Sequence, residues 1–456
     1  MLTAPAAASL RSDFADRLSV ALGPGAEITL GESVSTLRGG QPRHDDVRID
    51  LPPLAAEIRT LLETRSGLLD MRAVTMTAQP GRSWSARAAQ LDFPSLRHLL
   101  PAVPGGVSTL AAAACAAAGQ ELRVELDGYR SVPEAAGAGV SAARVVLSAT
   151  GLPATPREAA QAGTGCALVL SLDVSGLAWV SGAGDRLDLR GLTIAVRHDP
   201  GAAPDGAASV DLSVTDLVVT RRDGALRPVA ISRMTAQGAV PAARVDGLIG
   251  FFLRGSRPSA PGWADLWTPG PASIIGHGIA LPPETVFGSA LAGIWRTATG
   301  RTSVDFNLQV ARSPAAGGIR LHATIDSRGL GALAAGAVFS PLRDGAGPAV
   351  LTADLLARDH GLAGVLARLE AGTVQAFLAA RIRATAPEFF AAVQADGLLR
   401  AIGEATDWIS ASQDRWMQVA LRPPDPVALG SIPASLARPA PQRARILGVH
   451  HGPARP

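Results

Sequence analysis

Apolar and polar side chains alternate along much of the chain, most regularly between residues 121 and 238. In SVDLSVT, residues 209–215, the valine and leucine side chains fall on one side of an extended backbone, while Asp211 and Ser213 fall on the other. This period-two pattern is typical of a β-strand with one buried face. It predicts a sheet that is apolar on one side and polar on the other.

Several extended segments follow one another in this region, and clusters of Gly, Asp and Pro join them. This order favours an antiparallel meander, in which each strand pairs with its predecessor and only one face is covered. The segments are residues 121–130, 143–152, 166–180, 186–199, 208–223 and 229–238.

Three of these segments share a local signature, LDVSGLAWV (172–180), LDLRGLTIAV (187–196) and VDLSVTDLVV (210–219). Each begins apolar-Asp-apolar, and a leucine follows five residues after the first apolar position, or seven in the last. The signatures begin 15 and 23 residues apart, which is too unequal for a solenoid repeat. Asp173, Asp188 and Asp211 recur at matching positions and are predicted to lie on the polar face, facing water or pairing with Arg190, Arg197 and Arg221.

Helical patterns occur at both ends of the chain. Leu10, Phe14, Leu18 and Leu22 are four residues apart and Gly23 follows, which predicts an amphipathic helix over residues 10–22. Pro53 near the first turn of PLAAEIRTLLETRS predicts another helix. This second helix spans residues 53–66, and further helices are predicted at residues 286–300, 361–385 and 387–410. Further strands are predicted at residues 26–40, 44–52, 68–81, 84–93, 302–312, 318–329, 349–359 and 415–429.

We therefore expect an α+β, β-dominated fold, in which a large curved antiparallel sheet packs against helices that come mainly from the C-terminal half. Residues 255–273 carry four prolines and three glycines, which predicts a linker. The predicted organisation is an N-terminal amphipathic helix (1–25), a β-rich antiparallel domain (26–254), the Pro/Gly/Trp linker (255–273), an α+β C-terminal half (274–432) and a disordered tail (433–456).

The composition excludes whole-chain disorder, because 47% of the 456 residues are hydrophobic and 18% are charged. Every basic residue is arginine, which we attribute to the codon usage of a GC-rich bacterium. The formal net charge is +3, and the arginines are interspersed with acids instead of forming a basic stripe. We therefore expect no nucleic-acid partner.

Catalytic and cofactor motifs are missing from the sequence. Without lysine the chain has no phosphate-binding P-loop and no Schiff-base chemistry, and it contains neither H-E-x-x-H nor G-x-S-x-G. The tightest His/carboxylate cluster is His44-Asp45-Asp46, which we interpret as a solvated turn before a strand, with a metal site as the alternative. His322 is a core or face residue of a strand. We expect no catalytic, cofactor-binding or metal-binding residues, no cofactor and no enzymatic activity.

The two cysteines, Cys115 and Cys166, have no metal-binding or C-x-x-C spacing. Whether they pair depends on the compartment, since an oxidising one would allow a disulfide. No apolar window of 18 residues is present, so we expect no transmembrane segment. The start MLTAPAAAS lacks a basic region and an apolar core, which indicates either an ordinary cytoplasmic start or the remnant of a signal sequence.

Residues 350–432 contain short motifs that resemble those of a known class of proteins. ARDHGL places Asp359, Gly361 and Leu362 between a predicted strand and a helix, IDSRGL repeats the motif from Asp326, and DRWMQVALRPPDPVALGSI forms a strand with a Pro-rich exit. This part resembles β-rich cell-envelope proteins of proteobacteria that are distantly AsmA-like. The resemblance implies residence in the periplasm or envelope, a non-enzymatic task and contact with lipid along a concave sheet.

We therefore expect a non-catalytic, envelope-associated protein that contacts lipid or another apolar ligand along its sheet; a cytoplasmic location is the alternative. Burial of the same apolar face under helices is the competing structural interpretation. An alternative function is protein–protein interaction or assembly, with an envelope protein or another copy, through exposed sheet edges or the loop with Trp263 and Trp267. A third is a hydrolase whose site is assembled from dispersed His and Asp residues.

Overall fold

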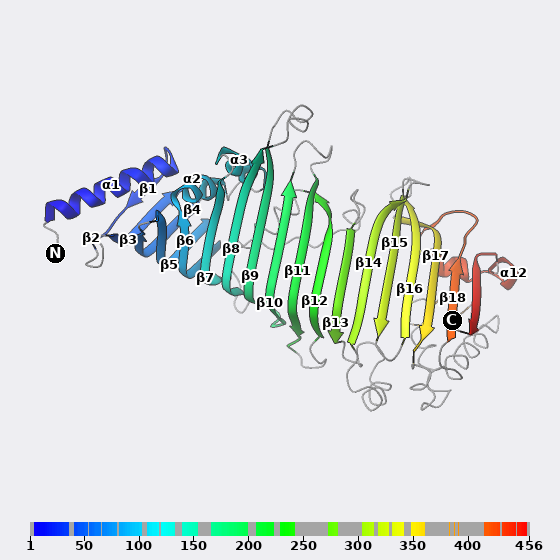
Figure 1. Ribbon diagram of the computed structural model, residues 1–456. Helices are drawn as coiled ribbons and strands as arrows, with labels where there is room; N and C mark the ends of the chain where they lie inside the picture. Colours follow the sequence, from blue (N-terminus) through cyan, green and yellow to red (C-terminus); the bar gives the residue numbers. More distant parts are fainter. Residues whose placement is uncertain are drawn as a thin grey trace. The chain divides into compact units, whose positions relative to one another are not determined.

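The structure is a computed structural model of the whole chain, and it is dominated by antiparallel β-strands (Figure 1). The residues that it describes are 4–35, 41–52, 54–64, 66–79, 82–102, 107–117, 120–132, 139–153, 166–198, 207–222, 229–241, 272–280, 303–313, 318–327, 331–341, 348–360, 383, 387, 391, 415–428, 431–443 and 445–453.

The chain divides into two compact units, which we describe separately. The first unit comprises Met1–Ala225 and Thr235–Pro261, and the second comprises Leu226–Met234 and Gly262–Pro456. Strand β12 (Val229–Pro241) contributes residues to both units. Of the predicted linker, residues 255–273, only Ala272 and Ser273 are described.

The first unit contains an antiparallel meander in which each strand from β3 to β10 pairs with the next one along the chain, up to β11 (Figure 1). The two shortest strands, β1 and β2, both pair with β3. The strands are β1 (Glu27–Thr29), β2 (Ser33–Ser35), β3 (Pro42–Leu51), β4 (Leu54–Glu63), β5 (Leu68–Gln79), β6 (Arg82–Asp92), β7 (Glu121–Val132), β8 (Gly139–Pro153), β9 (Cys166–Val180), β10 (Arg186–His198) and β11 (Ala207–Thr220).

Three helices pack on this sheet: α1 (Ala4–Leu22), α2 (Phe93–Ala102) and α3 (Val107–Ala116). Helix α1 contacts β1, β2 and β3, helix α2 contacts β6 and β7, and helix α3 contacts β8 and β9. Phe14 and Leu18 of α1, four residues apart as predicted, are buried on the side of the helix that packs on the sheet. The packing helices therefore come from the N-terminal quarter of the chain, whereas the helices predicted at 361–385 and 387–410 lie almost entirely outside the described residues, and that at 286–300 lies wholly outside them.

The buried face of the meander follows period two except at one level of every strand from β3 to β11. There, two successive inward-facing residues are three positions apart instead of two, as with Val174 and Leu177 in β9. The corresponding pairs in the other strands are His44–Val47, Ile58–Leu61, Met71–Val74, Ala86–Ala89, Leu126–Tyr129, Ala142–Val145, Leu189–Leu192 and Val214–Leu217.

The extra residues face one another across neighbouring strands, and we call their row the bulge line. It consists of Asp46, Arg59, Ala73, Arg87, Gly128, Ala143, Gly176, Arg190 and Asp216. The backbone is left-handed at every second member, with φ between 50° and 64° at Asp46, Ala73, Gly128, Gly176 and Asp216. Because all strands carry the extra residue at the same level, the pairing register is unchanged on both sides of the line. A bulge bends a strand and increases its twist, so aligned bulges bend the whole sheet at this level.

The outer face of the meander is polar. Arginine and carboxylate side chains two residues apart pair along single strands, as in Arg48 with Asp50 and Arg186 with Asp188, each at 2.7 Å. Asp188 thus pairs within its own strand, and Arg190 pairs with Asp216 at 3.6 Å instead of with a predicted aspartate. These solvent-exposed pairs keep the face soluble and contribute little to stability.

Two predictions of local structure are wrong. Residues 53–66, predicted as a helix, contain β4, which pairs with β3 on one side and β5 on the other. Residues 433–456, predicted as a disordered tail, contain α11 (Ile432–Leu436) in part, α12 (Ala440–Arg443) and β20 (Leu447–Pro453). Strand β20 pairs with β18 over its full length, so tertiary pairing orders a segment of low local propensity.

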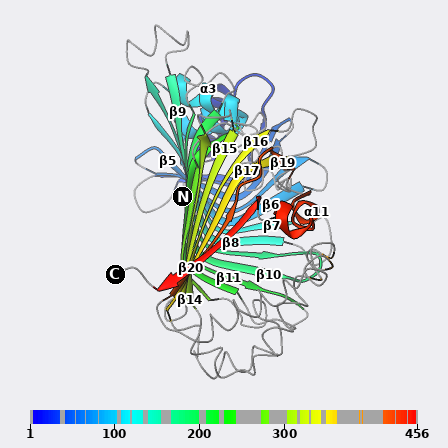
Figure 2. The same ribbon diagram turned by 90° about the vertical axis from the view of Figure 1, so that its right-hand side faces the viewer.

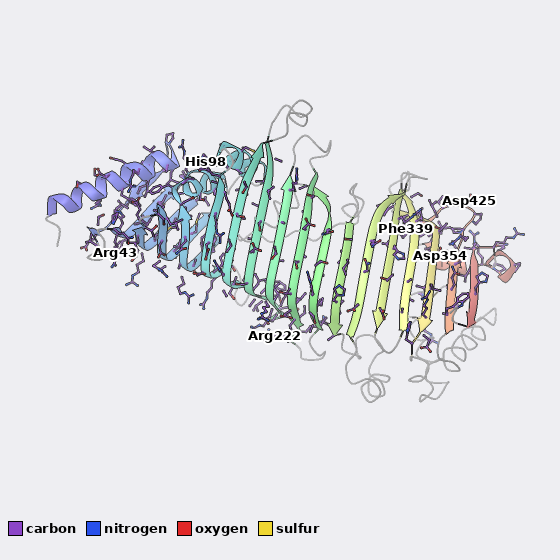
Figure 3. All side chains as sticks on the ribbon, viewed as in Figure 1. Arg43, His98, Arg222, Phe339, Asp354 and Asp425 are labelled. Carbon is purple, nitrogen blue, oxygen red and sulfur yellow. The ribbon has the colours of Figure 1, made fainter. Side chains whose placement is uncertain are left out.

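The second unit contains another antiparallel meander, in which β13 to β18 pair in chain order and β20 follows β18. Helix α11 contacts the short strand β19 (Figure 2). Arg422 donates to both carboxylate oxygens of Asp354 at 2.7 Å, next to the β17–β18 pair. Asp354, a residue of β17, is labelled in Figure 3. The strands are β13 (Ala272–Ala280), β14 (Ser303–Ser313), β15 (Gly318–Ser327), β16 (Gly331–Pro341), β17 (Pro348–Asp359), β18 (Arg415–Leu421) and β19 (Val427–Ala428).

Candidate functional site

The inner face of the first unit carries continuous rows of apolar side chains that run across seven strands, from β5 to β11. Paired residues lie on the same face of a sheet, and neighbouring strands are about 4.8 Å apart, so the members of each row are in side-chain contact range. One row is Leu69, Leu91, Val124, Leu147, Leu172, Ile194 and Leu212. The next row is Met71, Ala89, Leu126, Val145, Val174, Leu192 and Val214.

An apolar cavity of about 90 Å³ lies between this face and α2. Its only polar lining residue is Ser95, whose hydroxyl oxygen accepts a hydrogen bond from the backbone N–H of Arg123 at 2.7 Å. The other lining residues are Ile49, Ala56, Ile58, Met71, Val74, Met76, Trp84, Ala89, Leu91, Leu96, Leu99, Val124, Leu126 and Leu147. Pockets that enclose a whole small ligand hold about 300 Å³ or more, so this cavity accommodates only part of a larger apolar molecule.

The apolar rows extend beyond the helix layer. Among the described residues, no helix makes more than marginal contacts with β10 or β11. On these two strands Leu192, Leu212 and Leu217 are only half-buried, and Trp179 on the adjacent β9 is 37% exposed. On the same two strands Ile194, Val196 and Val214 are buried, so the open part of the apolar face there is limited to the half-buried leucines.

His44 lies under α1 at the other end of the unit. Its side chain is fully buried and stacks on Phe14 of α1, with ring centroids 4.0 Å apart and an interplanar angle of 12°. Phe14 in turn contacts Phe93 at the start of α2, edge to face, at 6.3 Å. These three aromatic rings connect β3, α1 and α2.

The predicted cluster His44-Asp45-Asp46 does not converge on one point. It lies within β3 and not in a solvated turn, so His44 points to the inner face, while Asp45 lies on the outer face and accepts hydrogen bonds from Arg43 and Thr60. Asp46 is an exposed member of the bulge line. Within the described part of the chain, no group of three or more His, Cys, Asp or Glu side chains is placed to hold a metal ion.

The remaining candidate residues are spread over the sheets. His322 is exposed on β15, opposite Gln309 and Gly336. Asp173 and Asp211 are exposed on the polar face of the first unit, as the alternation predicted. Trp263 and Trp267 lie outside the described residues. The inward position of His44 was not predicted from the sequence, because residues 44–46 were interpreted as a solvated turn before the strand.

Two further observations concern the cysteines and the helices. Cys115 at the end of α3 is disulfide-bonded, and Cys166 at the start of β9 is the only other cysteine in the chain. Among the described helices, none has both the length and the apolar character required to span a membrane.

Comparisons with family models, with curated proteins and with solved structures found no match to this chain.

Proposed function

We propose that the protein is a non-catalytic, envelope-associated protein that binds the acyl chains of a lipid on the inner face of its first unit. The observation that supports this proposal is the continuation of the apolar rows onto β10 and β11, beyond the helices that cover the rest of the face. A row of Val, Leu and Ile side chains matches an acyl chain, which needs continuous apolar contact and no polar group at a defined point.

The energetics favour a long, flexible apolar ligand over a small one. Burial of one methylene group contributes about 0.8 kcal/mol, so a chain that follows a row over several strands gains several times this amount. The cavity under α2 adjoins the first of these rows, since Leu91, Val124 and Leu147 belong to that row and also line the cavity. We expect a chain to lie across β9–β11 with its end in or near this cavity.

The disulfide at Cys115 supports a location outside the reducing cytosol, because structural disulfides persist mainly in oxidising compartments. This agrees with the envelope residence implied by the resemblance to AsmA-like proteins.

The test compares two arginine substitutions on adjacent residues of β11. Leu212 faces the apolar row, whereas Ser213 is on the opposite face, opposite Thr193. Protein purified from its native host without detergent is extracted and analysed by mass spectrometry. We expect co-purified lipid in the wild type and in Ser213→Arg, and a loss of at least tenfold in Leu212→Arg. Wild-type protein without lipid, or equal lipid in both variants, would contradict the proposal.

A further inference from the structure

The environment of His44 in β3 is built for a neutral imidazole ring. The side chain is fully buried between Phe14 and the inner face of the sheet, directly opposite Leu61 of β4. Its Nδ1 atom is 2.9 Å from the hydroxyl oxygen of Ser33 in β2. Its Nε2 atom is buried and has no hydrogen-bond partner among the described residues.

A protonated ring would not be accommodated at this position. An imidazolium donates from both nitrogen atoms, and here Ser33 supplies an acceptor to only one of them. The charged donor at Nε2 would be left buried and unpaired, which costs far more than a neutral unpaired acceptor. Attraction between an imidazolium and the face of Phe14 offsets part of this cost.

The charged groups around His44 do not reverse this preference. Burial is the main cause that lowers the pKa of His44 below its ordinary value. Glu63 of β4 and Asp45 of β3 act in the opposite direction, and Arg17 of α1 acts with burial. Glu63 forms an ion pair with Arg17, which donates to its carboxylate at 2.8 Å. The effects of these two charges on the pKa of His44 therefore largely cancel.

We propose that His44 is a pH-sensitive latch that holds α1 on the sheet and releases it under mildly acidic conditions. When α1 leaves, His44 loses Phe14 and becomes accessible to water, where its pKa returns to about 6.5. The undocked state therefore binds a proton that the docked state excludes. Docking is at full strength above pH 6.5 and weakens as the pH falls below it.

The release of α1 would also loosen the cover of the cavity. Phe93, the first residue of α2, contacts Phe14. The guanidinium of Arg17 lies 5.5 Å from the ring centre of Phe14 and 5.3 Å from that of Phe93. Leu96 and Leu99, one and two turns further along α2, line the cavity. A single titration at His44 thus acts on both helices at this end of the unit.

The test is amide hydrogen exchange of the whole chain, measured by mass spectrometry at pH 7.5 and 5.5 and corrected for intrinsic rates. One excluded proton changes the docking equilibrium by about tenfold per pH unit below 6.5. We therefore expect the protection of α1 to fall by up to about tenfold between these two values, while β7 and β8 keep their protection.

The variants separate His44 from other titrating groups. In His44→Gln, which stays neutral and still offers an amide to Ser33, α1 should show no pH dependence. His98→Gln is the matched control, since His98 of α2 is another histidine whose pKa is lowered by burial, and it should behave like the wild type. Equal protection of wild-type α1 at both pH values, a parallel loss in β7 and β8, or a loss that persists in His44→Gln would each overturn the proposal. The wild-type measurement decides even if His44→Gln does not fold.

Discussion

A Cβ atom on Gly176 of β9 would lie 3.0 Å from the Cβ atom of Ala143 on β8. Both residues belong to the bulge line and face each other across the β8–β9 pair. Gly176 also has φ of 59°, which side chains with a Cβ adopt only at a cost. A similar contact occurs in the β6–β7 pair, where a Cβ atom on Gly128 would lie 3.1 Å from the Cβ atom of Arg87. Glycine at these positions allows the extra residues to align.

Substitution of Gly176 therefore tests the bulge line. Gly176→Ala should lower the free energy of unfolding by about 1–2 kcal/mol, from the left-handed backbone and the contact with Ala143. Gly139→Ala is the control, because no atom lies within 4 Å of its Cβ position, and it should change stability by less than about 0.5 kcal/mol. Urea denaturation followed by circular dichroism measures both. Equal stability of the two variants would show that the bulge line does not constrain the sheet.

The bulge line also explains which parts of the fold were predictable from the sequence. Where a strand is long, period two dominates, and the strand predicted at residues 166–180 coincides with β9. In the repeated signature, the leucine five residues after the first apolar position is the inward-facing residue that follows the bulge line. Leu177, five residues after Leu172, is an example. In the shorter β4, the step from Ile58 to Leu61 combines with Leu54 into a helix-like spacing. The helix predicted at residues 53–66, with Pro53 near its first turn, is therefore wrong, although the spacing agrees with it.

Tertiary contacts account for the elements that the pattern missed. Helices α2 and α3 are ten residues each, too short for a distinct 3.6-residue period, and they depend on packing against the sheet. Strand β20 contains two histidines and two glycines and is ordered by pairing with β18. The apolar face was predictable from alternation, but the cavity was not, because it requires α2.

The aromatic contact between α1 and the sheet predicts a large effect of Phe14. Its side chain is 1% exposed and contacts the rings of His44 and Phe93. Phe14→Ala should lower the free energy of unfolding of the first unit by about 3–5 kcal/mol at pH 7.5. Val20→Ala, on the same helix but 77% exposed, is the control and should leave stability nearly unchanged. A loss below 1 kcal/mol in Phe14→Ala would show that α1 is not part of the folded unit.

The disulfide predicts a specific result in thiol titration. The chain has two cysteines and Cys115 is bonded, so denatured protein should show no reactive thiol before reduction and two afterwards. Reduction should lower the free energy of unfolding by about 2–4 kcal/mol, since it releases α3 from the constraint. One or two reactive thiols in protein purified from its native compartment would contradict the disulfide and the location that it supports.

The approach of α3 to the sheet gives an independent prediction. A Cβ atom on Gly151 of β8 would lie 2.5 Å from the backbone oxygen of Ala114 and 2.7 Å from the Cα atom of Cys115. Gly151→Ala should therefore displace α3 and increase hydrogen exchange of residues 107–116, while the exchange of β3–β5 remains unchanged. Gly336→Ala in β16, where no atom lies within 4 Å, is the control. Unchanged exchange of α3 in Gly151→Ala would mean that the helix does not pack as closely as described.

The most direct measurement of the central claim is photo-crosslinking with a fatty acid that carries a diazirine on its acyl chain, followed by peptide mapping. The inner face of β9–β11 carries Trp179, Leu192 and Leu212, and the outer face carries Asp173, Thr193 and Ser213. We predict that crosslinks concentrate on the inner-face residues and on the lining of the cavity under α2, and that excess unlabelled fatty acid suppresses them. Crosslinks distributed equally over both faces, or none on β9–β11, would contradict an acyl-chain-binding sheet.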